Sequence, residues 1–514
     1  MGIIYQKDKR VGITYAYESK SYWDKEKKQP RSIRTLIGKL DEATGEIVPT
    51  RERKPVLPEP VFSRTYGGAT YLFDEIAKEL GVWQDMCECF PYIQEQILSI
   101  AYYVILEDRN PLSRFPKWAA THSHPYGKEI TSQQSSSLFA GITENAKHEF
   151  FMRQSQRKKE REYWFYDATS ISSYSKTLEQ VRYGHNNDHE HLEQINLAVL
   201  CGEESQLPFY YRKLPGNITD VKTVKNLIAD ISDFTDSHVK LVMDRGFYSE
   251  DNVNAMLLAD YTFLIGVKMS LSYVREGLDQ VREEIRTFDH YHQDEDLYMD
   301  SVVIPWHDTQ GTHAERSMFL HLYYSGEKAL DDERTLHKKL RIWKEELEGG
   351  KRQARNEKSY KQYFDAETTP ALGVHVSVNQ QALEHAKRNY GYFAMISNEI
   401  NDSAQALRLY RNKDLIEKTF ENMKDRLSLR RVHVSSEKSL DGKLFVEFVA
   451  LILLSDINRR MRKANLYKKY TMQGMLDQID LIECFEQKGK PVRYGEITKK
   501  QVDIYHALTV LPPS

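Results

Sequence analysis

Apolar and polar residues alternate with a period of two in several parts of the chain, and this alternation predicts β-strands. Near the N-terminus the pattern covers residues 11–18 and 34–40, with a turn at 41–46. Aromatic and β-branched runs follow at residues 162–169, 195–201, 209–213, 239–244 and 261–267. Helical patterns at 220–234 and 252–259 separate the last of these runs. Three strands followed by helix, strand, helix and strand predict a mixed α/β sheet.

Helical spacing dominates both flanks of this sheet pattern. Before it, helices are predicted at 72–80, 93–106, 132–142 and 147–160. The short helices around 132–142 are interpreted either as a helix-turn-helix or as part of an ordinary bundle, and the bundle is the better match. After it, the sheet pattern is interrupted and returns only at 391–398. The interruption contains strand-like runs at 301–306 and 318–324 and a charged helix from 333 to about 363. An apolar helix is then predicted at 444–458.

Residues 409–427 contain no glycine or proline and consist mainly of good helix formers, which predicts a single helix. We count about 100° per residue around this helix from Tyr410. Lys413, Glu417 and Lys424 then share with it an arc about 60° wide, beside an apolar stripe. Taken alone, this pattern is better explained by an ordinary charged helix with i,i+4 ion pairs than by a functional site.

The composition is that of a soluble globular protein of two to four domains, with 514 residues, 40% hydrophobic residues and a mean hydropathy of -0.62. No apolar run approaches the roughly 20 residues of a membrane span, and the first ten residues lack the apolar core of a signal peptide. The four cysteines are too few and too scattered for a disulfide framework. We therefore expect a cytoplasmic, reduced protein.

The net charge of -3 gives no global sign of nucleic-acid binding, but the charges are segregated along the chain. Residues 405–469 hold 16 Lys and Arg against 8 Asp and Glu. Residues 277–300 hold 8 Asp and Glu against two arginines. The helix predicted at 409–427 therefore lies in a segment with an excess of positive charge.

Three acids occupy positions that suit metal-ion chemistry. Asp167 and Asp244 each end a predicted strand, and Glu417 lies on the predicted late helix. Two Mg²⁺ ions about 3.5–4 Å apart need hard oxygen ligands, with one carboxylate bridging the ions and others capping them. These acids predict a two-metal phosphoryl-transfer site, in which one ion activates the attacking oxygen and the other stabilises the leaving oxygen.

The same residues resemble the DDE transposases of bacterial insertion sequences, in the subgroup with the signature Tyr-x2-Arg-x3-Glu-x6-Lys around the third acid. This chain has Tyr410-x2-Lys413-x3-Glu417-x6-Lys424, with lysine in place of the arginine. Further similar pieces are Asp-Ala-Thr-Ser at 167–170, Met-Asp-Arg-Gly-Phe-Tyr-Ser at 243–249, Leu-Pro-Gly-Asn-Ile-Thr-Asp at 214–220 and Gly-Tyr-Phe-Ala-Met-Ile-Ser-Asn at 391–398. The resemblance covers about 160–268 and 390–465.

The resemblance implies an α/β fold, a ribonuclease-H-like mixed sheet interrupted by a large insertion, with an N-terminal β unit and a helical domain. The expected domains are a basic β unit at 1–56, a helical domain for DNA binding or dimerisation at 57–160, the first part of the catalytic core at 161–268, the insertion at 269–389, the second part of the core at 390–470 and a helical tail at 471–514.

The resemblance also implies a function, which is Mg²⁺-dependent strand cleavage and strand transfer at the ends of an insertion sequence. Asp167, Asp244 and Glu417 would be the catalytic residues and would hold two Mg²⁺ ions, with Mn²⁺ as a substitute. The partners would be double-stranded DNA, as terminal inverted repeats and target, and a second copy of the chain in a homodimer. The protein would then be nucleoid-associated when bound to DNA.

Four further residues are expected to contact DNA by this resemblance. Tyr410, Lys413 and Lys424 would contact phosphates near the transposon end. Lysine lacks the fork with which arginine binds a phosphate through two hydrogen bonds, so the geometry at Lys413 differs from that of the family. Trp306 in the insertion is a candidate for stacking on a flipped base, although a core position is the more frequent one for such a tryptophan.

Other interpretations stay open at this stage. His185, Asp188 and His189 have the composition of a metal cluster, but a hydrated loop explains them better. A catalytically inactive or domesticated DNA-binding relative would keep the fold without cleavage, and a ribonuclease-H-like nuclease or recombinase would cleave without strand transfer. A glycoside hydrolase with two carboxylates leaves the basic region at 405–469 unexplained.

Overall fold

A computed structural model describes most of the chain. The residues described are 2–9, 12–24, 29–50, 63–107, 110–157, 162–173, 178–184, 192–235, 238–306, 316–369, 373–421, 424, 426–427, 431–432, 436–486 and 490–514. They divide into two compact units, Met1–Ser63 with Glu486–Pro491, and Arg64–Phe485 with Val492–Ser514. Among the described residues, no helix is both long enough and apolar enough to cross a membrane.

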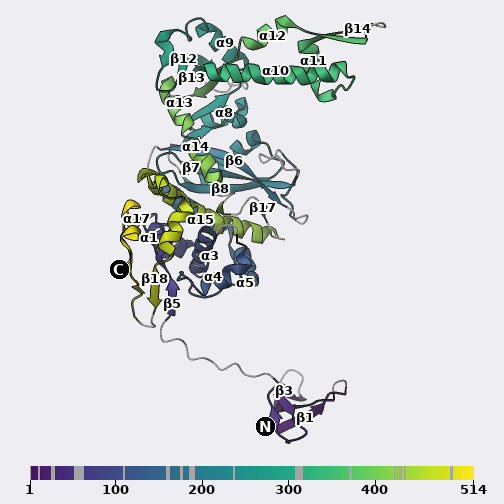
Figure 1. The fold of residues 1–514 in the computed structure, drawn as a ribbon, viewed down its shortest axis with the longest axis vertical. Helices are drawn as coiled ribbons and strands as arrows, with labels where there is room; N and C mark the ends of the chain where they lie inside the picture. The colour runs from purple at the N-terminus through teal and green to yellow at the C-terminus, as the bar shows by residue number, and fades with distance from the viewer. Residues whose placement is uncertain are drawn as a thin grey trace. The chain divides into compact units, whose positions relative to one another are not determined.

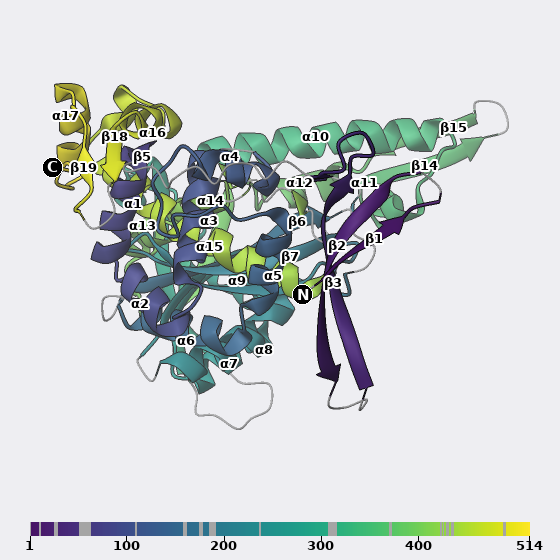
Figure 2. The same cartoon turned by 90° about the horizontal axis from the view of Figure 1, so that it is seen from below.

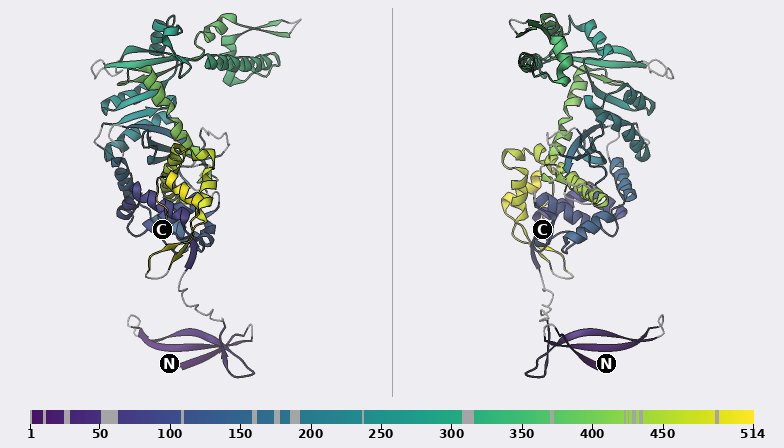
Figure 3. Two further views of the ribbon diagram at one scale, coloured as in Figure 1. Left: turned by 60° about the vertical axis from the view of Figure 1, so that its left-hand side comes forward. Right: turned by 90° about the vertical axis from the view of Figure 1, so that its right-hand side faces the viewer.

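The N-terminal unit is a four-stranded antiparallel sheet. Its strands, which pair in chain order, are β1 (Gly2–Lys7), β2 (Thr14–Asp24), β3 (Gln29–Leu40) and β4 (Ile47–Val48). Both views of Figure 3 show the long hairpin of β2 and β3 at the purple end of the chain. All residues of β1 are exposed, whereas Ala16 in β2 is buried. The alternating runs predicted at 11–18 and 34–40 correspond to β2 and β3.

The larger unit is built on one mixed sheet, with the order β11-β12-β13-β16-β10-β9-β6-β7-β8 and with β17 beside β6. Its strands are β6 (Tyr163–Ser173), β7 (Gln194–Gly202), β8 (Pro208–Pro215), β9 (Lys240–Met243), β10 (Thr262–Val267), β11 (Tyr291–His292), β12 (Leu297–Trp306), β13 (Arg316–Tyr324), β16 (Tyr392–Ser397) and β17 (Arg431–Val432). The predicted mixed α/β sheet is confirmed.

Strands β6, β9 and β10 are parallel neighbours at the centre of this sheet, and β7 and β8 add to them antiparallel. Every residue of β10 is buried, which fits a central strand covered on both faces. Connections between parallel strands need a crossover, and helices provide it here. The helical elements between β8 and β10 are η2 (Asp220–Thr223), α7 (Val224–Phe234), η3 (Arg245–Phe247) and α8 (Glu250–Leu258).

The segment predicted as one insertion has two structural parts. In the first part, β12 and β13 form a hairpin that pairs with β16 and so extends the main sheet, accompanied by α9 (Ser272–Val281) and η4 (Phe288–His290). The second part forms an arm of α10 (Gly326–Glu348), η5 (Ala354–Asn356), α11 (Glu357–Tyr363), β14 (Phe364–Thr369), β15 (Gly373–Val378) and α12 (Gln380–Lys387). Figures 1 and 2 show its hairpin at the far end of α10. The arm has its own small core around Leu347 and Tyr360.

Helices from both ends of the larger unit pack together beside β8 (Figure 1). They are α1 (Gly68–Glu79), α2 (Val82–Cys89), α3 (Gln94–Leu106), η1 (Leu112–Arg114), α4 (Phe115–Ala119), α5 (Ser132–Gly141), α6 (Glu144–Gln156), α15 (Glu437–Lys463), η7 (Leu466–Lys468), α16 (Met472–Asp480) and α17 (Lys499–Ala507). A small sheet of β5 (Ser63–Tyr66), β18 (Glu483–Glu486) and β19 (Arg493–Tyr494) joins the two ends. Since α5 packs along α15, it belongs to a helical bundle, the alternative favoured over a helix-turn-helix.

The helix predicted over 409–427 is divided in the structure. Helix α13 (Ser403–Arg411) ends just before α14 (Asp414–Glu421), and the two residues between them form a turn. The amide of Lys413 bonds to the carbonyl of Tyr410 at 3.1 Å, an i→i−3 bond that tightens the chain at this point. The predicted single helix is therefore two helices, and Lys413 in the turn between them still lies near both Tyr410 and Glu417.

Candidate active site

Asp167 and Asp244 lie side by side on adjacent parallel strands. The residues before them, Tyr166 in β6 and Met243 at the end of β9, are register partners. Because side chains alternate between the two faces of a sheet, residues at the same level on parallel neighbours point to the same face. The two carboxylates therefore meet on one face of the sheet, at the carboxyl end of β9.

Helix α13 and the turn after it bring two side chains to Asp244. The hydroxyl of Tyr410 donates a hydrogen bond to Asp244 Oδ1. The Lys413 ammonium lies 3.5 Å from the same oxygen and 5.5 Å from the centroid of the Tyr410 ring. Two of the signature residues therefore contact the second acid directly.

The two aspartates differ in their protonation chemistry. Burial raises the pKa of Asp167 to about 7, against the opposing effects of the Lys413 charge and the N–H of Ala168, 2.8 Å away. Burial also pushes the pKa of Asp244 upward, but the hydrogen bond from Tyr410 and the charge of Lys413 outweigh it and leave that pKa below its ordinary value. Asp244 is thus held as a carboxylate, while Asp167 lacks enough positive charge nearby.

Glu417 stands on the other side of Lys413. Its carboxylate is 3.7 Å from the Lys413 ammonium, and its side chain is 57% exposed. The Lys413 ammonium therefore lies between the carboxylates of Asp244 and Glu417 and pairs with both. Across the described ranges, no three His, Cys, Asp or Glu side chains are grouped so that they could hold a metal ion. The structure brings two of the three predicted acids together and places the third beyond a lysine.

The donor set suits a hard divalent cation. Carboxylate oxygens are the ligands that Mg²⁺ and Ca²⁺ prefer, and a carboxyl whose pKa is raised by burial gains most from a nearby positive charge. Asp167 and Asp244 fit such an ion as they stand. Glu417 is more than half exposed, and its carboxylate pairs with Lys413.

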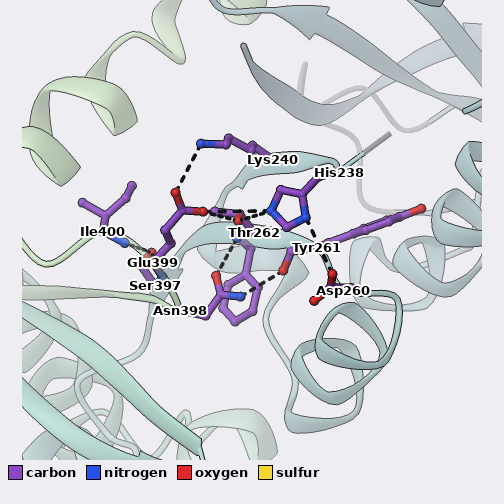
Figure 4. A network of polar contacts seen from close by, with 10 residues as sticks. His238, Lys240, Asp260, Tyr261, Thr262, Ser397, Asn398, Glu399 and Ile400 are labelled. Atoms are coloured by element: carbon purple, nitrogen blue, oxygen red, sulfur yellow. Dashed lines mark hydrogen bonds and ion pairs between the residues drawn. The ribbon is translucent and has the colours of Figure 1, made fainter. Parts of the chain in front are cut away.

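A polar network fixes the chain just before α13 (Figure 4). Glu399, two residues after β16, accepts a hydrogen bond from Thr262 and pairs with Lys240 at 3.3 Å. The Asn398 side chain accepts a hydrogen bond from the N–H of Phe263 and donates one to the carbonyl of Tyr261, each at 2.9 Å. These bonds tie β16 to the starts of β9 and β10, so α13 begins from a fixed point.

A glycine makes room for Tyr410. An ideal Cβ built on Gly266 in β10 would lie 3.0 Å from the Tyr410 hydroxyl oxygen and 3.2 Å from the amide nitrogen of Arg245. Both contacts are tighter than ordinary van der Waals packing, so a side chain at this position would displace the hydroxyl that holds Asp244. Sequence reasoning missed this role, and a lone glycine within a predicted strand was its only signal.

Asp220 is a further acid near the pair that sequence reasoning did not assign. It begins η2, and its negative charge contributes to the raised pKa of Asp167. An ideal Cβ on Gly246 would lie 3.1 Å from Asp220 Oδ2, so η3 passes close to this carboxylate. The signal was available, since Asp220 closes the Leu-Pro-Gly-Asn-Ile-Thr-Asp piece at 214–220.

Two further predicted site residues, Lys424 and Trp306, are buried. Lys424 is only 8% exposed. Trp306 is 7% exposed, donates its indole N–H to Asn254 Oδ1 at 2.8 Å and packs edge-on against Tyr273. The structure therefore gives Trp306 a core position and does not bring it to the acids. The loop that contains His185, Asp188 and His189 is outside the described residues.

The comparisons with known proteins identify the family. A family model described as "Transposase DDE domain" matches residues 159–453, more than half of the chain. None of the curated proteins matches. Among solved structures the chain is similar to "Cryo-EM structure of piggyBac transposase synaptic complex with hairpin DNA (SNHP)", with a TM-score of 0.37 and 10% identity over 80% of this chain and 78% of that one. By the family match, the chain belongs to the transposase DDE domain family and is a DDE-type DNA transposase that depends on a divalent metal.

Proposed function

We propose that this transposase uses Mg²⁺ ions held by Asp167, Asp244 and Glu417 to cut DNA at the ends of its own element and to join the cut ends to target DNA. The observation that supports this most directly is the register match of Asp167 and Asp244, with Tyr410 and Lys413 fixed on the second acid. When bound, the Mg²⁺ ions activate the attacking oxygen and stabilise charge on the leaving oxygen, and Mn²⁺ substitutes for them.

Each residue of the site then has a part in holding or aiming the reacting groups. Asp244 is kept ionised by Tyr410 and Lys413, so it is ready to serve as a metal ligand. Asp167 becomes a full ligand once a cation supplies the charge that its surroundings lack. The Lys413 ammonium lies between Asp244 and Glu417. It would be available to DNA phosphates if these carboxylates held metal ions.

We propose further that the five strands β8-β7-β6-β9-β10 form a ribonuclease-H-like core. Three antiparallel strands followed by two parallel ones, with α7 and α8 on the crossovers, support this assignment. Asp244 directly follows the carboxyl end of β9, and Asp167 lies within β6, next to the point where its pairing with β9 ends. The carboxyl ends of parallel strands are where ligands bind in sheets of this kind. The strands β16, β13, β12 and β11 continue the sheet beyond this core.

The DNA contacts and the assembly are also proposals. Double-stranded DNA is the substrate, as transposon end and as target, and two copies of the chain hold the two ends together. Tyr410, Lys413 and Lys424 are proposed to act at the transposon end. We do not extend the proposal to Trp306, because its side chain is buried, its indole N–H is bonded to Asn254 and its ring packs against Tyr273.

The test is cleavage of DNA that carries the ends of the element. We expect Asp167→Ala, Asp244→Ala and Glu417→Ala to abolish Mg²⁺-dependent cleavage while DNA binding stays close to wild type. Asp331→Ala, in an exposed ion pair on the arm, is the control and is expected to cleave normally. Wild-type cleavage by Asp244→Ala would refute the metal site. Cleavage without transfer of the cut 3′-hydroxyl to target DNA would make the protein a nuclease.

A further inference from the structure

An open pocket of about 540 Å³ lies between the end of the signature region and the C-terminal helices. Arg426, two residues after Lys424, forms one side, and the segment Tyr467–Met472 forms the other. This segment connects α15 to α16 through η7. The pocket is separate from the two aspartates, and none of the residues that line it has a part in the proposed cleavage site.

The charges that line this pocket are all positive. Arg426, Lys468 and Lys469 line it, and no acidic side chain does so among the described residues. Within the same described part of the chain, the side chains of Lys468 and Lys469 form neither an ion pair nor a hydrogen bond, and both are exposed. The Arg426 guanidinium donates a hydrogen bond to Gln473 Oε1, a neutral amide oxygen, at 3.1 Å. Such a cluster attracts an anion with more than one negative charge.

Aromatic rings stand next to these charges. Tyr467 is 44% exposed, and its hydroxyl donates to Asn458 Oδ1 at 2.6 Å. Tyr470 also lines the pocket, and Lys500 lies 5.3 Å from the centroid of its ring. Basic residues interleaved with exposed aromatic rings are typical of surfaces that follow a nucleic-acid backbone, where the cations meet phosphates and the rings meet sugars and bases.

The position of Arg426 along the chain limits how far the pocket can lie from the cleavage site. Nine residues separate it from Glu417, and a fully extended chain of that length spans roughly 30 Å. One turn of B-DNA is about 34–36 Å long. Arg426 therefore lies within about one turn of B-DNA from Glu417, a distance that a single bound duplex can span.

We propose that this pocket binds backbone phosphates of the DNA on which the transposase acts, about one helical turn or less from the cleaved bond. Lys468 and Lys469 supply the phosphate contacts, Arg426 orients the pocket, and Tyr467 and Tyr470 pack against the sugar-phosphate chain. The inference rests on the proposed function for its substrate. It gives the C-terminal segment, expected from its sequence to be a helical appendage, a role in holding DNA.

The salt dependence of binding to a labelled duplex of random sequence tests this pocket. The plot of log affinity against log salt has a negative slope, and each phosphate contact that is lost makes this slope shallower by about 0.9. The double variant Lys468→Glu with Lys469→Glu should make the slope shallower by about 1.8. The ratio of the affinity at about 0.1 M salt to that at about 1 M should therefore be up to about 60-fold smaller than in the wild type. The control carries Lys338→Glu and Lys339→Glu, an adjacent exposed pair on α10, and should keep the wild-type slope. Equal slopes for the two double variants would overturn the proposal.

Labelling of the unmodified protein gives a second measurement that does not depend on how a variant folds. The duplex should protect Lys468 and Lys469 from an amine-reactive reagent and leave Lys338 and Lys339 reactive. Equal labelling of both pairs with and without DNA would refute the pocket. If the pocket fails while Asp244→Ala still loses cleavage, the proposed function stands. If wild-type protein neither binds nor cleaves DNA ends, the proposed function fails first.

Discussion

Asp167 and Asp244 stand at the same level on two adjacent parallel strands, because the residues before them are register partners. Strand register therefore decides whether the two carboxylates share a face of the sheet, since a slip by one residue would turn one of them to the opposite face. The sheet is held in this register by hydrogen bonds of β6 on one side of β9 and of β10 on the other. The position of the acids is thus a property of the sheet and not of a flexible loop.

Removing the Tyr410 hydroxyl should weaken the site by a defined amount. Tyr410→Phe deletes the hydrogen bond to Asp244 and keeps the ring that packs beside Lys413. Hydrogen bonds to charged groups contribute about 1.5–3 kcal/mol, so we expect a loss of about 2 kcal/mol in unfolding free energy and slower cleavage. Urea denaturation and a cleavage assay check this. Tyr291→Phe, which breaks a more exposed bond to Asp296, is the control and should leave cleavage unchanged.

Gly266→Ala should reproduce the cleavage defect of Tyr410→Phe without touching either functional side chain. Its new methyl group would lie 3.0 Å from the Tyr410 hydroxyl oxygen, closer than ordinary contact, so a small shift of the tyrosine is expected to weaken its hydrogen bond to Asp244. Because both changes act on the same contact, the double variant should cleave no more slowly than the slower single variant. Multiplied defects in the double variant would show that Gly266 acts on cleavage by another route.

Features of the fold that depend on local sequence patterns were predictable, whereas those that depend on contacts between distant segments of the chain were not. The strands 162–169, 195–201 and 239–244 were predictable because β6, β7 and β9 have local patterns of apolar residues. The pairing of β13 with β16 was not, since about seventy residues of chain lie between these strands and only tertiary packing joins them. The two strands predicted inside the insertion therefore belong to the main sheet.

The candidate site shows the same division. Asp244 was predictable because it directly follows the apolar strand β9. Asp167 was predictable from the aromatic run before it, but the expectation that it ends a strand was wrong, because β6 continues to Ser173. The break between α13 and α14 was not, because residues 409–427 are mainly good helix formers without glycine or proline. Lys413, in the turn, contacts Asp244, which is distant in the chain. Arg411, in the basic segment 405–469, pairs with Glu295, in the acidic segment 277–300. No local pattern in either segment indicates this contact.

Lys413→Met should make the protein more dependent on divalent metal for stability. Without metal, the variant leaves Asp244 and Glu417 without the ammonium that now lies between them. Both carboxylates are about half exposed, so the loss should be about 1 kcal/mol. A cation at about 100 times its dissociation constant adds roughly 2.7 kcal/mol to stability.

The metal-induced rise in melting temperature should be larger in Lys413→Met than in the wild type, because in the variant the metal displaces no ammonium. Thermal unfolding with and without Mg²⁺ or Mn²⁺ measures it. Lys418→Met removes an exposed lysine of α14 and should show the wild-type rise. A smaller rise in Lys413→Met than in the wild type would mean that this lysine helps the metal to bind.

His321 should make the protein less stable as the pH falls below about 7. It is fully buried in β13, where its Nδ1 lies 2.7 Å from the Ser301 hydroxyl, and burial lowers its pKa from 6.5 to about 4. The unfolded chain therefore takes up a proton near pH 6.5, whereas the folded chain does so only near pH 4. Its contribution is fully present above the unfolded pKa and is lost as the pH falls through this window.

Between about pH 7 and about pH 5, this difference in pKa corresponds to a loss of about 2 kcal/mol in unfolding free energy. His321→Asn has no titrating ring and should be less sensitive to pH than the wild type by that amount, whatever its stability at pH 7. Urea midpoints at the two pH values measure the effect. His124, whose pKa burial also lowers to about 4, acts in the same direction and is present in both proteins, so it cancels in the comparison. The same pH sensitivity in both proteins would show that His321 is not the group that titrates.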